Sequence, residues 1–317
     1  MRTISIVVPA YNESECVDEL AARLRAVFEG LAPAYDFEAI IVENGSADDT
    51  YEKLLAIRGR DPRFKIVRLS RNFGAEGGVT AGLRHASGDA AVIMCADLQD
   101  PPEVIPRFIE RWEQGYQNVY GVVTRRAGEG LVRRAATGVF YWLIDKLSDR
   151  PVPRNVSDFR LVDRRAYEAL NRMHERNRMM RTMWGWIGFT SAPVEHVRPR
   201  RHGGKSTYAF ARNVRFALNG ILASSVAPLK LIPLFGITLA GMSFVTVVGL
   251  AIVWVRFGVP FAGYGTIVAL ILLMFGLVFL FLGIISEYVG MIFEEVRARP
   301  SFIVAAEHGF DDDRARP

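Results

Sequence analysis

One stretch near the end of the chain carries almost no charge. Between Leu231 and Ser286 the sole charged residue is Arg256, which separates two uncharged runs, Leu231–Val255 and Phe257–Ser286. Each run exceeds the roughly 20 residues with which a helix crosses the apolar core of a bilayer. The alternative is a buried hairpin in a soluble core, but core helices are seldom apolar on every side over such a length. We therefore predict two transmembrane helices that form a hairpin over residues 231–286.

Basic residues flank this hairpin on both sides. Arg212, Arg215 and Lys230 precede it, and Arg297 and Arg299 follow it. Because the cytoplasmic flanks of membrane spans are enriched in arginine and lysine, both flanks are expected in the cytoplasm. This orientation predicts a multi-pass protein of the inner (cytoplasmic) membrane, with the large N-terminal domain in the cytoplasm.

The same reasoning divides the chain into four parts. They are a cytoplasmic domain at 1–206, an amphipathic juxtamembrane helix at 207–230, the two spans at 231–286 and a cytoplasmic tail at 287–317. No signal peptide is expected, because the first apolar run, Ile4–Pro9, is short and leads into polar sequence. The charged segment from Glu307 to Pro317 is expected to be disordered.

The net charge of +5 bears on the kind of partner that the chain meets. A basic chain can bind nucleic acid, but the sequence holds no recognition motif for it, and basic residues beside membrane spans more simply meet anionic lipid. The two cysteines, Cys16 and Cys95, lack the spacing of metal ligands and fit a reducing compartment. The sequence therefore favours a membrane partner and no nucleic acid.

Short apolar runs alternate with helix-like segments through the first part of the chain. The expected strands are Ile4–Val8, Phe37–Val42, Phe64–Leu69, Ala90–Cys95 and Val119–Val123. The expected helices are Glu15–Glu29, Asp49–Ile57, Glu76–Ala86 and Pro102–Gln114. This order predicts an α/β domain with a mostly parallel sheet that is covered by helices on both faces. Such sheets bind ligands at the carboxyl ends of their strands, where the strand order switches.

Polar residues follow four of the expected strands. The segments are Pro9–Glu13, Glu43–Thr50, Ser70–Gly74 and Cys95–Asp100. Ser46 and Asp48 can be simple N-caps of the next helix. Carboxylate or amide groups after all four strands are harder to explain as caps, so the sequence predicts a polar site at this edge of the sheet.

Several strings along the chain resemble one enzyme family. They are VVPAYNE, ENGSADDT, SRNFGAEGGVTAGLRHASGD, ADLQDPPEVI, SDFRLVDRRAY, WGWIGF and RRHGGKSTY. Each string is weakly specific, but their order is specific, and it resembles the family 2 glycosyltransferases of the GT-A fold. Within that family the chain is similar to the polyprenyl-phosphate branch, which includes dolichol-phosphate mannose synthase and bacterial enzymes that glucosylate undecaprenyl phosphate. The likeness extends through the two C-terminal apolar runs and implies a Rossmann-like GT-A domain.

The resemblance implies a nucleotide-sugar donor, expected to be a UDP-sugar, bound across the first strand ends. The donor-binding candidates are Pro9, Tyr11, Glu13, Glu43, Asn44 and Ser46. The family usually has two aspartates where this chain has Glu43 and Asn44. A neutral amide can still hydrogen-bond a uracil edge, so base binding is retained as an expectation.

The resemblance also explains why an apolar strand leads into Asp97. When a nucleotide sugar reacts, negative charge builds on the departing diphosphate, and a divalent cation can stabilise it. Asp97 and Gln99 are the expected ligands of Mg²⁺ or Mn²⁺, with Asp100 as a further contact through water. Cys95 stands where the family has another aspartate, and a thiol is a poor ligand for a hard cation, so Cys95 is expected to pack inward. The alternative for Asp97 is an N-cap before Pro101.

On the acceptor side, the resemblance implies that Asp158 lies near the anomeric carbon as a candidate base. An acceptor phosphomonoester has a second pKa of about 6, so at neutral pH it is largely ionised and already a nucleophile. Asp158 can therefore have another role: to orient the acceptor, to bind its last proton or to help to hold metal. Arg160 can clamp a phosphate through bidentate hydrogen bonds. Its alternative is a surface ion pair with Asp163.

Further basic residues are candidates for phosphate binding. They are Arg125, Arg126, Arg198, Arg200, Arg201 and Lys205. Contact with lipid headgroups is an equally simple explanation for each of them. The methionines and tryptophans between Met179 and Trp186 are expected to form a hydrophobic face.

The sequence thus predicts an inverting, metal-dependent glycosyltransferase that moves one sugar from a nucleotide donor to a polyprenyl phosphate at the cytoplasmic leaflet. Self-association into a homo-oligomer is an expectation from the resemblance. Two alternatives stay open. A processive polysaccharide synthase is disfavoured because the chain lacks a Q-x-x-R-W string. A non-catalytic nucleotide-sugar-binding membrane subunit is favoured by Cys95 and Asn44, and disfavoured by the retained Asp97, Gln99 and Asp158.

Overall fold

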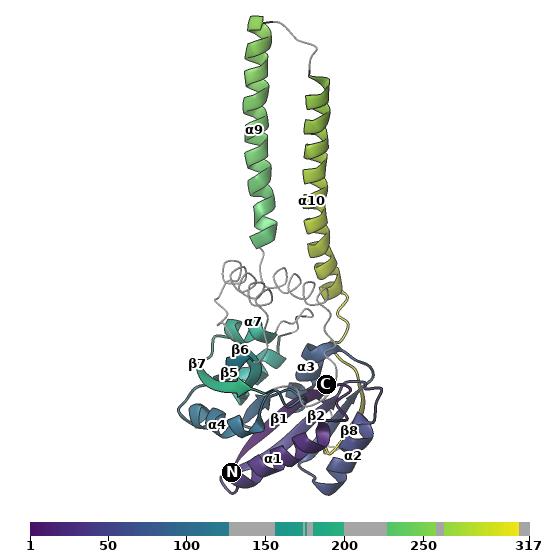
Figure 1. Ribbon diagram of the computed structural model, residues 1–317, viewed down its shortest axis with the longest axis vertical. Coiled ribbons are helices and arrows are strands. Elements are labelled where there is room, and N and C mark those ends of the chain that lie inside the picture. Colours follow the sequence, from purple (N-terminus) through teal and green to yellow (C-terminus); the bar gives the residue numbers. More distant parts are fainter. Residues whose placement is uncertain (127–155, 174, 176–179, 200–226, 258–262, 311–317) are drawn as a thin grey trace.

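The computed structural model describes residues 1–126, 156–173, 175, 180–199, 227–257 and 263–310. These residues form a globular α/β domain and a pair of long helices that project from it (Figure 1). The N-terminus lies in the globular domain, and the chain returns to that domain after the second long helix.

The order of elements follows the predicted alternation of strands and helices. The strands are β1 (Arg2–Ala10), β2 (Tyr35–Glu43), β3 (Phe64–Leu69), β4 (Ala90–Ile93), β5 (Asn118–Arg126), β6 (Val156–Asp163), β7 (Ser191–Arg198) and β8 (Val304–His308). The helices are α1 (Val17–Leu31), α2 (Thr50–Arg60), α3 (Gly74–His85), η1 (Pro102–Val104), α4 (Ile105–Glu113), α6 (Arg164–Asn171), α7 (Met180–Trp186), α9 (Ala227–Phe257) and α10 (Tyr264–Val296).

The eight strands of the described residues belong to one mostly parallel sheet, as predicted. Their order is β7-β5-β6-β4-β1-β2-β3-β8. β6 and β8 run antiparallel to their neighbours, and the remaining pairs are parallel. The strand order switches at β1, which pairs with β2 on one side and with β4 on the other.

Helices cover both faces of the sheet. α1, α2 and α4 pack on the face to which Ile4, Ile6 and Val8 of β1 contribute, whereas α3, α6 and α7 pack on the face that receives Val7. Successive side chains of a strand point to opposite faces, so a strand buried on both sides needs an unbroken apolar run. The run from Ile4 to Val8, interrupted only by Ser5, meets this requirement.

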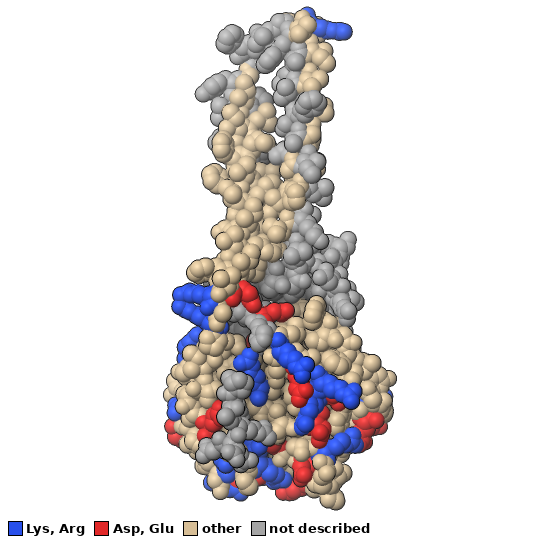
Figure 2. Space-filling view, turned by 180° about the vertical axis from the view of Figure 1, so that it is seen from behind, with Lys and Arg blue, Asp and Glu red and all other residues tan. Residues whose placement is uncertain are grey.

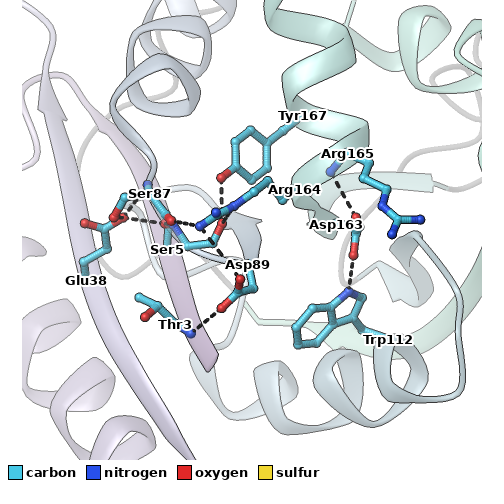
Figure 3. Close-up of polar contacts among 11 residues, drawn as sticks. Thr3, Ser5, Glu38, Ser87, Asp89, Trp112, Asp163, Arg164, Arg165 and Tyr167 are labelled. Carbon is cyan, nitrogen blue, oxygen red and sulfur yellow. Dashed lines mark hydrogen bonds and ion pairs between the residues drawn. The ribbon is translucent and has the colours of Figure 1, made fainter. Parts of the chain in front are cut away.

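A network of buried polar groups holds the amino ends of the central strands (Figure 3). Glu38 Oε1 accepts hydrogen bonds from Ser5 Oγ at 2.6 Å and from the Ser87 amide at 2.7 Å. The Tyr167 hydroxyl donates to the Gly88 carbonyl oxygen at 2.6 Å. The loop between α3 and β4, which ends one of the recognised strings, therefore has a structural role at the sheet edge opposite the predicted site.

The chain after α10 returns to the globular domain, where β8 pairs with β3 and forms the edge of the sheet. Two further contacts hold β8: the Tyr51 hydroxyl lies 2.8 Å from His308 Nε2, and His85 Nε2 lies 2.9 Å from Glu307 Oε1. The expectation of disorder from Glu307 onward is therefore wrong for the described residues up to Phe310. Charge alone suggested a solvated tail, but pairing with an open strand edge and burial against α3 order it.

The two long helices α9 and α10 match the positions of the predicted spans and lie side by side (Figure 1). Among the described residues, the segment Met274–Val296 of α10 is long and apolar enough to cross a membrane, and none of it is buried within the protein. Figure 2 shows that the described surface of this pair is largely free of charged residues, which gather on the globular domain and at the base of the helices. One candidate span is thus found, and a two-span hairpin stays a prediction.

Candidate active site

The predicted site lies at the carboxyl edge of the sheet, beside the switch in strand order. β1, β2 and β4 are parallel neighbours there, so the loops that follow them meet at one edge. β6 runs antiparallel to β4, with Arg160 paired to Ile93, so the beginning of β6 lies at the same edge. The topology therefore brings the regions around Tyr11, Glu43, Asp97 and Asp158 together.

Hydrogen bonds join the loop after β1 to the loop after β2. The Asn12 amide donates to Ser46 Oγ at 3.0 Å, and the Ala47 amide donates to Asn12 Oδ1 at 2.9 Å. The Glu13 amide donates to Thr50 Oγ1 at 3.0 Å. Asn12 has a φ of 54°, a conformation that asparagine tolerates better than most residues. These hydrogen bonds hold the loops after β1 and β2 together, and we call the surface of the two loops the braced surface. It includes two of the predicted donor-binding residues, Glu13 and Ser46.

Glu43 is fully buried and organises this surface from beneath. Its Oε1 accepts a hydrogen bond from the Ser46 amide at 2.5 Å, and its Oε2 lies 3.2 Å from Arg68 Nε. Gly45 has a φ of +70°, and a Cβ atom on it would lie 2.6 Å from the Arg71 carbonyl carbon. Only glycine fits such a close backbone approach without a shift. Glu43 is thus placed to shape the loop that carries Ser46.

The carboxamide of Asn44 is used within the protein. Its Nδ2 donates to the Gly74 carbonyl oxygen at 2.9 Å, and its Oδ1 accepts from the Phe73 amide at 2.9 Å. Since the Gly74 carbonyl only accepts and the Phe73 amide only donates, the orientation of the carboxamide is determined. Asn44 is 3% exposed. Asn44 was predicted to hydrogen-bond the base of the donor, whereas both ends of its carboxamide bind the loop after β3.

The loop after β4 presents Asp97 and Gln99. The Gln99 amide donates to Asp97 Oδ1 at 3.1 Å, and Leu98 between them has a φ of 59°. This tight turn leaves both side chains partly exposed, while Leu98 is buried in the core. Pairing between a side-chain oxygen and the amide two residues on is typical of aspartate in turns. The turn holds the two predicted metal ligands close together.

Asp100 supports this loop from below. It is buried, its Oδ2 accepts from the Cys95 amide at 3.1 Å, and its Oδ1 accepts from Ser157 Oγ at 3.3 Å. Arg198 Nη2 lies 3.9 Å from the same Oδ1. Burial raises the pKa of Asp100, and the nearby Asp97 adds to this rise, while Arg198 opposes it. These contacts give Asp100 a structural role in holding the loop.

Cys95 lies among acidic side chains. Burial raises the pKa of its thiol well above the ordinary value, and the charges of Asp100, Asp97 and Asp158 raise it further. The thiol is therefore neutral at physiological pH. A carboxylate in its place would be a fourth negative charge in the same small region, which would need a cation for balance.

The described residues can be tested against a divalent cation. Among them, no group of three or more His, Cys, Asp or Glu side chains is arranged to hold a metal ion by itself. Mg²⁺ commonly binds through one or two carboxylates together with substrate phosphates, and does not need a cage made of protein alone. Asp97 and the amide oxygen of Gln99 fit this mode of binding, in which the donor diphosphate supplies the remaining ligands.

The beginning of β6 places Asp158 at the surface beside α7. Arg181 of α7 forms an ion pair with it, in which Nη2 of Arg181 lies 3.0 Å from Oδ1 and 2.9 Å from Oδ2 of Asp158. The side chain of Asp158 is 61% exposed and that of Arg181 is 27% exposed. Asp158 thus lies exposed at this edge of the sheet, and it is held by an arginine that the sequence reasoning did not select.

Arg160 points into the domain below Asp158. It is 2% exposed, and its guanidinium lies 5.3 Å from the centre of the Trp184 ring. Burial lowers the pKa of Arg160 to about 10, so the group stays cationic at neutral pH. The alternative of a surface pair with Asp163 is not found, because that carboxylate accepts from Trp112 Nε1 at 2.9 Å and caps α6.

Glu76, in the first turn of α3, is a further acidic group near Asp158. Burial raises the pKa of Glu76 to about 7, and the charge of Asp158 adds to this rise. A hydrogen bond from the Met180 backbone and the charges of Arg181 and Arg160 act in the opposite direction. The sequence reasoning treated Glu76 only as the start of a helix. The sequence feature that could have identified Glu76 is a single acidic residue in a turn otherwise built from small residues, GAEGG.

Three predicted phosphate-binding residues receive little structural description. Arg125 belongs to β5, but its side chain lies outside the described part of the chain. Arg201 and Lys205 lie outside the described residues altogether. Arg198 is described, and it lies beside Asp100 under the loop that carries Asp97. The described edge therefore combines acids that can hold a cation with arginines that can hold phosphate.

Comparisons with known proteins point to one enzyme family. The sequence profile of glycosyl transferase family 2 matches residues 5–170. The uncharacterized glycosyltransferase YkcC of Bacillus subtilis is 37% identical over 310 residues, which cover 98% of this chain and 95% of that protein. The SfII prophage-derived bactoprenol glucosyl transferase of Shigella flexneri is 36% identical over 305 residues, covering 96% and 98%.

Solved structures show a weaker likeness. The mannosyl-3-phosphoglycerate synthase of Rubrobacter xylanophilus has a TM-score of 0.48 at 17% identity, over 69% of this chain and 72% of that one. The family match is stronger, because the profile spans β1 through most of α6 and the relatives span nearly the whole chain. The chain therefore belongs to glycosyl transferase family 2.

Proposed function

We propose that this protein is a membrane-anchored glycosyltransferase that transfers one sugar from a UDP-sugar to a polyprenyl phosphate at the cytoplasmic leaflet. The observation that carries the proposal is the convergence of Asp97 and Asp158 at the carboxyl edge of the sheet. A cation site for a diphosphate and an acceptor site are both needed there. The full-length likeness to bactoprenol glucosyl transferases supports the lipid acceptor.

The proposed reaction is a single displacement with inversion. An oxygen of the acceptor phosphate forms a bond to the anomeric carbon while the bond from that carbon to the donor diphosphate breaks. The bonding electron pair leaves on the diphosphate oxygen. When bound to Asp97 and Gln99, Mg²⁺ or Mn²⁺ would supply charge stabilisation to this leaving group. Asp158 would orient the acceptor on the opposite side of the sugar.

The donor nucleotide is proposed to lie on the braced surface after β1 and β2. Pro9, Tyr11 and Glu13 would line the base and ribose, and Ser46 would contact the same groups. Glu43 would act through Ser46, whose amide it binds at 2.5 Å. Asn44 would act by holding the loop that follows β3.

The membrane arrangement follows from the acceptor. A polyprenyl phosphate keeps its chain in the bilayer and its phosphate at the surface, so an enzyme for it must work at that surface. We propose that both α9 and α10 span the inner membrane, with the catalytic domain in the cytoplasm. Arg297 and Arg299, at the end of α10, would then lie at the level of anionic headgroups. Arg125, Arg201 and Lys205 are proposed as further phosphate contacts.

A non-catalytic donor-binding subunit is a second candidate, because Cys95 removes an acid that the family usually has. A transfer assay separates the two functions. Full-length protein in detergent is given labelled UDP-sugars and undecaprenyl phosphate, with Mn²⁺ or with EDTA. If the protein is an enzyme, we expect lipid-linked label with Mn²⁺ and its disappearance with EDTA. Tight UDP-sugar binding without lipid-linked label, across several sugars, would favour the binding subunit and refute the enzyme.

A further inference from the structure

Asp158 and Arg181 form an ion pair at the predicted acceptor site. Arg181 approaches both carboxylate oxygens within 3.0 Å, and its Nε lies 3.3 Å from Oδ1. A planar guanidinium fork binds carboxylate and phosphate oxygens with the same geometry. An arriving phosphate can therefore take over the contact that Asp158 now makes.

A second guanidinium, that of Arg160, lies near enough to Asp158 and Arg181 to feel the charges of both. Arg160 is buried, and its Nη2 makes a long hydrogen bond of 3.4 Å to the Ser157 carbonyl oxygen. Within the described part of the chain, its Nε is buried without a hydrogen-bond partner. A buried cation with an unused donor is costly unless an anion approaches it. The surroundings of Arg160 thus favour an additional anion near Asp158.

Glu76 completes a cluster of four charged groups. The charged groups that face it are Asp158 and Arg160 on β6 and Arg181 on α7, and the Met180 backbone donates to it. With Glu76 ionised, the two arginines balance the two acids, whereas with Glu76 protonated the cluster carries one excess positive charge. Protonation of Glu76 would therefore favour the binding of a phosphate.

The cluster also lies on the side of the domain that is close to the membrane helices. α7 is at the end of the globular domain from which α9 and α10 project (Figure 1). A donor diphosphate is expected beside Asp97, whereas a phosphate on a membrane lipid reaches the domain from the direction of these helices. This placement favours the acceptor as the source of the phosphate.

We propose that Arg181 is a ligand of the acceptor phosphate, that it rests on Asp158 until the acceptor binds, and that Glu76 is a positioning residue for it. The inference rests on the proposed function and adds two residues to its acceptor site. When Arg181 moves to the phosphate, Asp158 becomes available to orient the acceptor. Donor and acceptor both carry phosphate groups, so the donor diphosphate is the alternative ligand of Arg181.

The test uses full-length protein in detergent micelles and measures binding of undecaprenyl phosphate and of UDP separately. Arg181→Lys keeps the charge but removes the fork, and the proposal predicts about tenfold or more weaker binding of undecaprenyl phosphate, with UDP binding within about twofold of wild type. Arg23→Lys is the matched control, because Arg23 binds Glu103 with a comparable fork, with Nε to Oε1 at 2.7 Å, and belongs to α1, which covers the opposite face of the sheet from α7.

Glu76→Gln supplies a readout that a merely structural role would not change. In wild type, undecaprenyl phosphate binding should weaken between about pH 6 and pH 8 relative to Glu76→Gln, because only wild type gains a negative charge there. Three results with Arg181→Lys would overturn the proposal: weaker UDP binding, equal losses for both ligands, or no loss at all. Identical pH profiles of wild type and Glu76→Gln would overturn it as well. Failure of wild type to transfer sugar would refute the proposed function, while the two binding measurements would still decide the role of Arg181.

Discussion

Asn44→Asp restores the acidic residue that is usual in the family, yet the structure predicts that it destabilises this protein. Asn44 Nδ2 donates to the Gly74 carbonyl oxygen at 2.9 Å, and Oδ1 accepts from the Phe73 amide at 2.9 Å. An ionised carboxylate can keep the second bond. It must then place its other oxygen against the Gly74 carbonyl, in a position that is almost fully buried.

The size of the effect follows from the groups involved. Losing one buried hydrogen bond costs about 0.5–1.5 kcal/mol, and a buried acceptor left without a donor costs about 1–3 kcal/mol more. The expected total is about 2–4 kcal/mol. In a domain of about 150–250 residues, 1 kcal/mol shifts the unfolding midpoint by about 2–4 °C, so we expect a decrease of roughly 5–15 °C.

The assay is thermal unfolding of the globular domain in the full-length protein in detergent, followed by circular dichroism. Burial raises the pKa of the introduced carboxyl group, and its protonated form can donate to Gly74. The penalty is therefore present above that raised pKa, and it shrinks as the pH falls toward about 4. The variant and the wild type should thus differ most at neutral pH and least in acid.

Asn72→Asp is the matched control in the same loop. Asn72 is exposed, and its Oδ1 accepts from the Gly74 amide at 2.7 Å, a bond that a carboxylate retains at the beginning of α3. We expect no destabilisation by this change. Equal midpoints for Asn44→Asp and wild type at neutral pH would refute the role assigned to Asn44, as would equal losses in the two variants.

Two further predictions concern the site and its support. Cys95→Asp adds a carboxylate beside Asp97 and Asp100, so it should lower the midpoint of thermal unfolding without metal, and Mn²⁺ should raise that midpoint more than it does in wild type. Equal responses to Mn²⁺ in thermal unfolding would contradict this. Gly82→Ala should destabilise by about 1–3 kcal/mol in the same assay, because its Cβ would overlap the buried Val7 side chain. Gly59→Ala, with open space around its Cβ, should be neutral or stabilising by up to about 1 kcal/mol, and a larger loss there than at Gly82 would contradict the packing argument.

The local pattern of the sequence predicted much of the fold. The strand Phe64–Leu69 has the predicted bounds, and the other expected strands end within a few residues of their predictions. Hydrophobic runs bounded by polar residues carry this information locally. β6, β7 and β8 were not predicted, because each is recognised by its pairing with a strand far away in the sequence: β6 with β4, β7 with β5, and β8 with β3 across the two long helices.

The candidate site shows the same division. Asp97, Gln99 and Asp158 were selected because they belong to recognisable strings, and the structure brings their segments to one edge of the sheet. Arg181 belongs to no such string, and Glu76 lies within one but was not selected from it. The importance of both depends on contacts between α3, β6 and α7 that no spacing in the sequence reveals.

The central claim is that Asp97 holds the cation that neutralises the departing diphosphate. Its most direct test is a titration with Mn²⁺ in the presence of UDP, followed by electron paramagnetic resonance, on wild type and Asp97→Ala. Asp36→Ala serves as the control, because Asp36 is exposed near the beginning of β2 and far from the site. We predict that Asp97→Ala weakens Mn²⁺ binding by at least about tenfold, with unchanged thermal unfolding, while Asp36→Ala binds like wild type. Wild-type Mn²⁺ affinity in folded Asp97→Ala would contradict the account.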